Sequence, residues 1–284
     1  MRRLVALCCF VALTCLSALS SNIIYGDSAN GGKPYLLEID KTTGAILATY
    51  NNLAGGFDGR GIAVIGNIAY YTDAADNNVY KYDLSTSTDL GVAFSVTGAA
   101  ALSTIAYDGT NFWLSSYLGG NQDYLYTPTG VLLKTITMAN CTANCDGVEY
   151  FVQNGKGYLI ENRGDGQGPY DVYDLNGNLV TAALIPGTGE TTGIAFDGIH
   201  FFTSSPDLGS IGSISEWTTS GALVQTLDLT GGSSGLLIED LSFDYSQVLN
   251  TPEPGSLTLM GAGIIGMWGS SSARSTARRN IREL

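Results

Sequence analysis

A strand–turn–strand pattern recurs along the middle of the chain. Residues 105–114 read IAYDGTNFWL, and residues 194–202 read IAFDGIHFF. The turn aspartates of these two copies are 89 residues apart, which is two periods of roughly 44 residues. Weaker copies occupy 62–71 and 148–160. Such a period predicts a ring or a stack of similar units rather than one mixed core.

Every unit contains a second turn, and most of these turns carry glycine. The turn glycines lie at positions 44, 130, 177 and 221, and a degenerate copy at 79–83 falls in the gap between the first two. Glycine supplies the positive φ that tight hairpin turns need. The flanking runs are rich in Ile, Val, Tyr, Thr and Trp and show no sustained helical period, which is typical of half-buried strands. Four short strands in each roughly 40–45 residues predict the blade of a β-propeller.

The count of units predicts an all-β propeller with five four-stranded blades. Four complete blades are expected at about 58–97, 101–138, 144–186 and 190–230. The fifth combines three N-terminal strands, near 23–25, 35–40 and 45–50, with one C-terminal strand near 240–244. This combination closes the ring and removes open sheet edges. A six-bladed ring and an open β-solenoid are the alternatives.

The Asp-Gly turns and the aromatic residues that follow them carry a resemblance. Tyr107-Asp108-Gly109, with Phe112 after it, and the second copy at 196–201 resemble the repeats of bacterial surface propellers. The resemblance implies the propeller fold and no transferable active site. Aromatic side chains in the predicted strands are expected to fill the cores between blades: Tyr70, Tyr71, Trp113, Tyr117, Tyr124 and Tyr126.

Both ends of the chain have the features of targeting signals. Arg2 and Arg3 precede an apolar run, so residues 1–21 are predicted to be a secretory signal peptide. The C-terminal end has three parts in order: Pro252-Glu253-Pro254-Gly255, the apolar stretch Ser256–Trp268, and the basic residues Arg274, Arg278 and Arg279. The apolar stretch is shorter than the roughly 17–25 residues of a standard membrane-spanning helix.

This order of parts resembles the PEP-CTERM sorting signal of Gram-negative bacteria. The resemblance implies export, a transient anchor in the inner membrane through the apolar stretch, and processing by a membrane-embedded exosortase. Such proteins occur in bacteria that make exopolysaccharide and biofilm matrix, so a polysaccharide is a further candidate partner. The predicted division is a signal peptide (1–21), a propeller (22–245), an extended linker (246–251) and the sorting signal (252–284) with a short apolar helix.

The body of the chain is strongly acidic. Residues 22–251 contain 24 acidic and 7 basic residues. A surface of this charge repels nucleic acid and anionic membranes, so neither is an expected partner of the body. The only histidine, His200, excludes a multi-histidine metal site and argues against a histidine-based catalytic triad. It is interpreted as a partly buried packing residue.

Cys141 and Cys145 are the two cysteines outside the predicted signal peptide. Oxidising conditions after export favour a local disulfide between them. Because it closes a small loop, its contribution to stability is expected to be about 2 kcal/mol. A metal site is the alternative, but neither a histidine nor a further cysteine is at hand to complete the coordination.

Carboxylates near the predicted inner strands are the candidate catalytic groups: Asp58, Asp146, Glu149, Glu190, Glu239 and Asp240. Paired carboxylates about 5–9.5 Å apart can hydrolyse glycosidic bonds. Turn formation and loop solvation are the simpler interpretation of these acids. Two loops, at 73–78 and 161–165, offer oxygen ligands for calcium, although neither matches the EF-hand pattern.

The functional prediction rests on the two targeting signals and on the absence of a catalytic motif from the sequence. The chain is expected to be an exported, non-enzymatic propeller of the cell surface or the exopolysaccharide matrix. Its partners are expected to be the secretion machinery and an exosortase, and no cofactor or metal is predicted. The alternative is a secreted glycan-active hydrolase or lyase, or a lectin, that uses acidic residues at the propeller channel.

Overall fold

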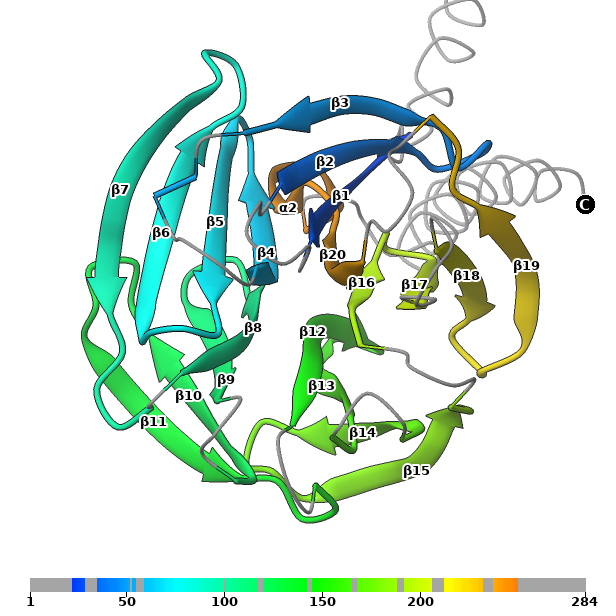
Figure 1. Cartoon of the computed structure of the whole chain (residues 1–284). Coiled ribbons are helices and arrows are strands. Elements are labelled where there is room, and N and C mark those ends of the chain that lie inside the picture. Colours follow the sequence, from blue (N-terminus) through cyan, green and yellow to red (C-terminus); the bar gives the residue numbers. More distant parts are fainter. Residues whose placement is uncertain are drawn as a thin grey trace, which may run out of the picture. The chain divides into compact units, whose positions relative to one another are not determined.

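A computed structural model describes the propeller body at residues 22–28, 35–51, 53–54, 59–99, 101–116, 120–141, 145–164, 168–187, 192–205, 212–231 and 237–249. These residues form five antiparallel sheets of four strands each, arranged as a ring (Figure 1). The predicted all-β propeller and its five blades are confirmed. The six-bladed ring and the open solenoid are therefore wrong.

The blades follow one another in chain order, except that the C-terminal strand joins the N-terminal blade. Blade A contains β20 (Ile238–Ser242), β1 (Ile23–Ser28), β2 (Tyr35–Asp40) and β3 (Ile46–Tyr50). Blade B contains β4 (Gly59–Ile65), β5 (Ile68–Asp73), β6 (Asn78–Asp83) and β7 (Thr88–Ser95). Blade C contains β8 (Leu102–Tyr107), β9 (Phe112–Ser116), β10 (Gln122–Tyr126) and β11 (Leu132–Thr137).

The last two blades have the same order of strands. Blade D contains β12 (Asp146–Gln153), β13 (Lys156–Asn162), β14 (Tyr170–Asp174) and β15 (Leu179–Ile185). Blade E contains β16 (Ile194–Phe196), β17 (His200–Ser205), β18 (Ser213–Thr218) and β19 (Leu223–Asp228). The first strand of each blade lines the centre of the ring and the fourth lies outermost, with β20 as the central strand of blade A (Figure 1).

Closure of the ring depends on β20, which pairs antiparallel with β1. Side chains of this C-terminal segment also reach the neighbouring blade B. There they accept hydrogen bonds from two backbone N–H groups of β4 and from one in the turn after it. The three bonds run from Ile62 N to Asp240 Oδ2 (3.1 Å), from Val64 N to Ser242 Oγ (3.1 Å) and from Gly66 N to Asp244 Oδ1 (2.8 Å). They satisfy N–H groups that have no partner strand on that side.

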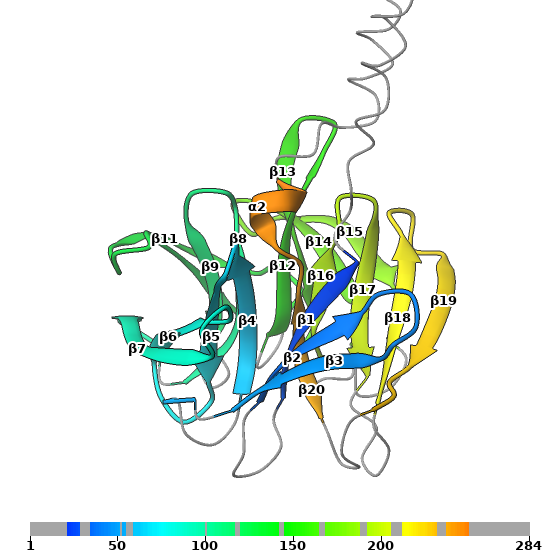
Figure 2. The ribbon, with the colours of Figure 1, turned by 90° about the horizontal axis from the view of Figure 1, so that it is seen from above.

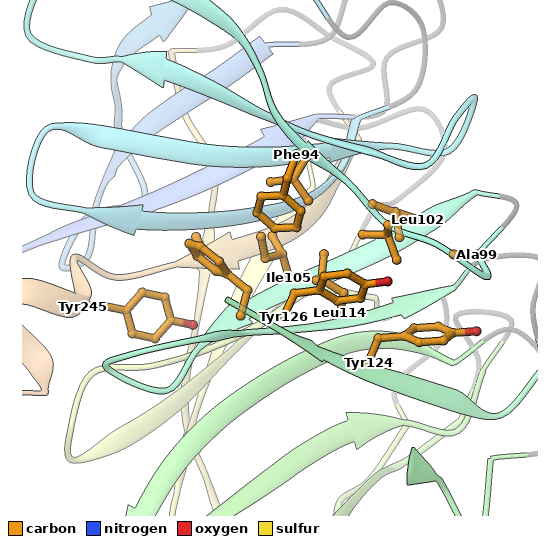
Figure 3. Packing of buried hydrophobic residues seen from close by; sticks show 12 residues of the cluster. Phe94, Ala99, Leu102, Ile105, Leu114, Tyr124, Tyr126 and Tyr245 are labelled. Carbon is orange, nitrogen blue, oxygen red and sulfur yellow. The ribbon is translucent and has the colours of Figure 1, made fainter. Parts of the chain in front are cut away.

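Apolar clusters fill the five junctions between neighbouring blades in the described part of the chain. Figure 3 shows the cluster between blades B and C, where Phe94 of β7 meets Leu114 and Tyr126 of blade C. The expected aromatic core is confirmed for Tyr71, Trp113, Tyr124 and Tyr126, which are buried, and for Tyr70, which is partly buried against the same clusters. Tyr117 lies outside the described residues.

The predicted turn glycines have positive φ and also sit tightly against the preceding blade. A Cβ atom on Gly221 would lie 1.8 Å from the carbonyl oxygen of Leu184. On Gly177 it would lie 2.3 Å from that of Thr137. Glycine is therefore required there by conformation and by space. The degenerate copy in blade B instead places a non-glycine residue, Ser87, at a φ of 52°.

The chain after β20 forms a short helix, α2 (Tyr245–Val248), at the end of the ring to which β4 and β8 point (Figure 2). The prediction of an extended segment beginning at residue 246 is wrong for these residues. Asp244 caps the helix by accepting a hydrogen bond from Ser246 N, and Tyr245 is buried. The hydroxyl of Tyr245 donates to Glu149 Oε1 at 2.8 Å. Burial of Tyr245 and its bond to Glu149 therefore anchor this helical turn on the body.

The body is one compact unit, Ser20–Leu249. The predicted signal peptide, the apolar stretch at 256–268 and the sorting signal lie outside the described residues, so the four-part division stays a prediction. Within the described residues, no helix has the length and apolar character needed to cross a membrane.

We expect the closing strand to be essential for folding. A chain of residues 22–249 should give a cooperative urea transition, because it holds all five blades. A chain of residues 22–237, which lacks β20, should give none, because β1 loses one of its two partner strands and the N–H groups of β4 lose their side-chain acceptors. Circular dichroism during urea titration measures this. A cooperative transition of similar midpoint in the shorter chain would show that closure contributes little.

Candidate functional site

Buried acids gather at one end of the ring, which we call the acid end. Here the inner strands begin and the second strand of each blade finishes, as the pairings of Gly59 with Asp73 and of Asp146 with Asn162 show. Eight acids at this end are buried: Asp27, Asp73, Asp123, Asp146, Glu161, Asp171, Glu239 and Asp240. Among the described basic residues, Arg60 and Arg163 pair with two of these acids, Glu239 and Asp171. The acid end therefore holds a large excess of buried carboxyl groups.

Asp240 lies at the centre of this end and is 1 % exposed. Its Oδ1 accepts hydrogen bonds from the backbone N–H of Ile194, at 3.3 Å, and from that of Leu241, at 2.9 Å. Its Oδ2 accepts from the backbone N–H of Ile62, at 3.1 Å, and from the hydroxyl of Thr104, at 2.9 Å. One carboxyl group thus contacts the inner strands of blades B, C and E from its own blade A.

Thr104 extends this network to the remaining blade. The hydroxyl oxygen of Thr104 accepts a hydrogen bond from Val148 N of blade D at 3.2 Å. The hydroxyl proton of Thr104 is donated to Asp240. The inner strands of all five blades are therefore joined through two side chains. Burial raises the pKa of Asp240 well above its usual range, and the four hydrogen bonds that it accepts oppose this shift.

The other acids proposed from the sequence also have partners within the fold. The hydroxyl of Ser103 donates to Asp146, which links blades C and D. Glu149 accepts from Tyr150 N at 2.7 Å and from Tyr245, and burial raises its pKa. Arg60 Nη1 lies 3.1 Å from Glu239 Oε2. Asp58 and Glu190 lie outside the described residues.

These positions limit what the four described candidates can do chemically. They are 1–9 % exposed, and their oxygens accept hydrogen bonds that hold blades, the closing strand or α2 in place. A glycosidase needs two carboxyl groups that a sugar can reach from either side of its bond. The geometry therefore assigns Asp146, Glu149, Glu239 and Asp240 to the support of the fold.

The two loops considered for calcium use their described oxygen atoms locally. Asp73 accepts from Ala75 N at 2.8 Å, and Asp76 accepts from Asn78 N at 2.7 Å and from the hydroxyl of Tyr80 at 2.6 Å. In the second loop, Asn162 accepts from the backbone N–H of the residue two positions further on. Among the described residues there is no group of three ligands that could hold a metal ion.

Cys141 and Cys145 form a disulfide whose Cα atoms are 5.9 Å apart. Both cysteines are buried in the apolar cluster between blades C and D, beside Val148. The bond therefore fixes the connection between these two blades at their shared core. His200, at the start of β17, lies with Nδ1 2.6 Å from Glu216 Oε1 and is about one-third exposed. It is thus within hydrogen-bonding distance of a carboxyl group at the surface of blade E.

Sequence reasoning missed three buried acids that lie on second and third strands. Asp27 of β1, Asp123 of β10 and Glu161 of β13 are 0 % exposed. No N–H or hydroxyl donor among the described residues bonds the carboxyl oxygens of Asp123 and Glu161, and Asp27 interacts with the backbone N–H of Ser28. Burial raises the pKa of Asp27, and the nearby Asp240, Asp73 and Glu239 raise it further. Their only signal in the sequence is an acid inside a strand of otherwise apolar or aromatic character.

Comparison with known proteins identifies the C-terminal end and the fold separately. Residues 250–275 match the family described as the PEP-CTERM protein-sorting motif. The body has the fold of a chain in the crystal structure of a nidogen/laminin complex, with a TM-score of 0.53 and 10 % identity over 79 % of this chain and 99 % of that chain. At this identity the likeness shows the fold alone. No protein with a curated description matches the chain.

The chain therefore carries a PEP-CTERM sorting signal, which confirms the resemblance drawn from its residues. This signal marks an exported protein that an exosortase processes at its C-terminal end. The match includes Pro252, Glu253, Pro254, Gly255 and Arg274, and it ends before the last two arginines of the basic cluster. All of these residues lie outside the described part of the chain.

We expect Asp240 to be the most sensitive polar residue of the body. Asp240→Ala leaves three buried donors of other blades unsatisfied and should lower the free energy of unfolding by about 3–5 kcal/mol. Thr104→Ser, which keeps the hydroxyl group, should cost about 1 kcal/mol for the lost methyl group. Urea denaturation of both variants measures the difference. Equal losses for the two would show that the network contributes no more than ordinary packing.

Proposed function

We propose that the protein is a non-catalytic propeller of the cell surface or extracellular matrix, released or anchored after an exosortase acts on its C-terminal signal. The observation that carries this proposal is the position of the sorting motif. The motif match begins at residue 250, immediately after Leu249, the last residue of the compact body. Processing within the motif leaves the closing strand and α2 in place.

The internal use of the acids supports the non-catalytic part of the proposal. Each described candidate for glycan chemistry accepts hydrogen bonds that hold the ring together, and Glu149 is covered by Tyr245. An exposed active site would need carboxyl groups that do not take part in these structural hydrogen bonds. A propeller whose polar groups serve its own stability is suited to act as a rigid module that presents its surface to a matrix polysaccharide.

The sorting signal provides the first test. Replacing Pro252-Glu253-Pro254 with three alanines should leave the body folded and block maturation, because the exosortase would lose its recognition sequence. The matched control is Thr251→Ala, which changes the residue beside the tripeptide. Fractionation and immunoblotting of cells with and without the exosortase measure processing. Maturation of the triple-alanine chain at the wild-type rate would show that the segment is an ordinary tail anchor.

The glycan-active alternative is tested with the purified body and host exopolysaccharide. We expect no release of reducing sugar by the wild-type protein, since the inner acids are buried. A glycan array run on the same sample separates a binding module from an inert scaffold. If reducing sugar is released and Glu149→Gln removes the activity without changing the thermal midpoint, the protein is a hydrolase and the non-catalytic proposal is wrong.

A further inference from the structure

Asp123 and Glu161 form a pair of acids that the proposed function does not use. Asp123 belongs to β10 of blade C, and Glu161 belongs to β13 of the neighbouring blade D. Both side chains are 0 % exposed, and their carboxyl groups lie within hydrogen-bond reach of each other. No N–H or O–H donor among the described residues bonds any of their four oxygens.

The strand pattern places these two side chains in one junction. Side chains alternate along a strand, so Asp123 and Leu125 of β10 lie on the same face, as do Leu159 and Glu161 of β13. Leu125 and Leu159 both pack in the apolar cluster between blades C and D. The acid pair therefore continues this interface toward the acid end, where carboxyl groups replace apolar side chains.

The charged groups around the pair give it no counter-ion. Asp146 of β12 and Asp171 of β14 are both near enough to Glu161 to disfavour its ionisation. The hydroxyl of Ser103 bonds Asp146. Arg163, two residues after Glu161 in the chain, is held by Asp171 through two bonds, at 2.7 and 2.9 Å. Tyr173 of β14 also contacts Asp171, with its hydroxyl 3.3 Å from Oδ2.

Two ionised carboxylates cannot remain in contact in such a place. Burial of each charge without a partner costs several kcal/mol, and the repulsion between them adds to that cost. A single proton removes the conflict, because a protonated carboxyl group donates an O–H···O⁻ hydrogen bond to its neighbour. A metal ion would also remove it, but no group of three ligands converges there among the described residues.

We infer that Asp123 and Glu161 share a proton and so form a pH-sensitive clamp between blades C and D. The proton is taken from water when the chain folds and returns to water when the clamp opens. In its protonated form the clamp joins β10 to β13 by a hydrogen bond. Loss of that proton leaves two buried charges in contact and loosens this one junction of the ring.

The direction of the pH dependence follows from burial. Burial raises the pKa of Asp123 to about 7, and it raises the pKa of Glu161 well above the usual range, with the charge of Asp123 adding to the effect. Both groups bind protons more tightly in the folded chain than in the unfolded chain. Asp123 therefore ionises first, as the pH rises through about 7, and leaves one proton shared with Glu161 that is lost only at a higher pH. The pair contributes its full stability below the pKa of unfolded carboxyl groups, and this contribution falls as the pH rises, first through about 7 and then further as the last proton is lost.

The test compares Asp123→Asn with the wild-type protein across this range of pH. The side-chain amide of asparagine donates permanently to Glu161, so it replaces the shared proton without needing one. The urea midpoint of the wild-type protein should fall between pH about 6 and about 8.5, and that of Asp123→Asn should fall less, by the contribution of the pair. The fall that remains in the variant belongs to other buried acids, such as Asp27 and Asp240. Asp83→Asn, which removes an exposed turn acid, is the matched control and should keep the wild-type fall.

Hydrogen exchange of the folded wild-type protein provides a second measurement that does not depend on the variant. Amides of β10 and β13 should exchange faster as the pH rises, beyond the intrinsic increase, while those of β2 and β6 should not. Equal pH dependence in wild-type and Asp123→Asn proteins, or uniform exchange across all blades, would overturn the clamp. A rise in the wild-type midpoint with added calcium at the upper pH, absent in Asp123→Asn, would also overturn it and assign a cation to the pair.

Discussion

The structure depends on how the two ends of the body complete a single blade. β20 pairs with β1 on one side, and its side chains bond the edge of β4 on the other. Asp240 is the residue where these requirements meet, since its oxygens also receive donors from blades C and E. A carboxyl group suits this position because each oxygen accepts two hydrogen bonds, whereas an apolar side chain would leave the inner strands with unsatisfied N–H groups. The apolar clusters then fix the spacing of blades that this centre has already joined.

The protein uses aspartate in two opposite ways at the two ends of the ring. In the exposed turns, Asp40 and Asp174 accept hydrogen bonds from turn residues, and this lowers their pKa. At the acid end, burial raises the pKa of Asp27 and Asp240. The first group supplies stability that is lost as the pH falls, and the second supplies stability that is lost as the pH rises. The contributions of the two ends to stability therefore change with pH in opposite directions. The folded ring is expected to be most stable at an intermediate pH.

Local patterns of the sequence predict much of this architecture. The recurring Asp-Gly turns and the turn glycines predict the blades because each requires one backbone conformation at a fixed place. The turn at Ser87 lacks glycine, so only the period of its neighbours marks it. The short helix at Tyr245 and the contact between Asp123 and Glu161 could not be predicted. Both depend on which strands meet across blade junctions, and a pattern within one strand contains no information about its partner in another blade.

The order of strands in blade A has a consequence for export. Ser28 of β1 pairs with Ile238 of β20, although the two are 210 residues apart in the chain. A chain that crosses the membrane from its N-terminus delivers β1 first and β20 last. Blades B to E are each built from consecutive strands and are free to form as they emerge, while the inner edge of β1 waits unpaired until translocation is nearly complete. The interval during which this edge can pair with a foreign strand is thus set by the speed of secretion rather than by the folding rate of any single blade.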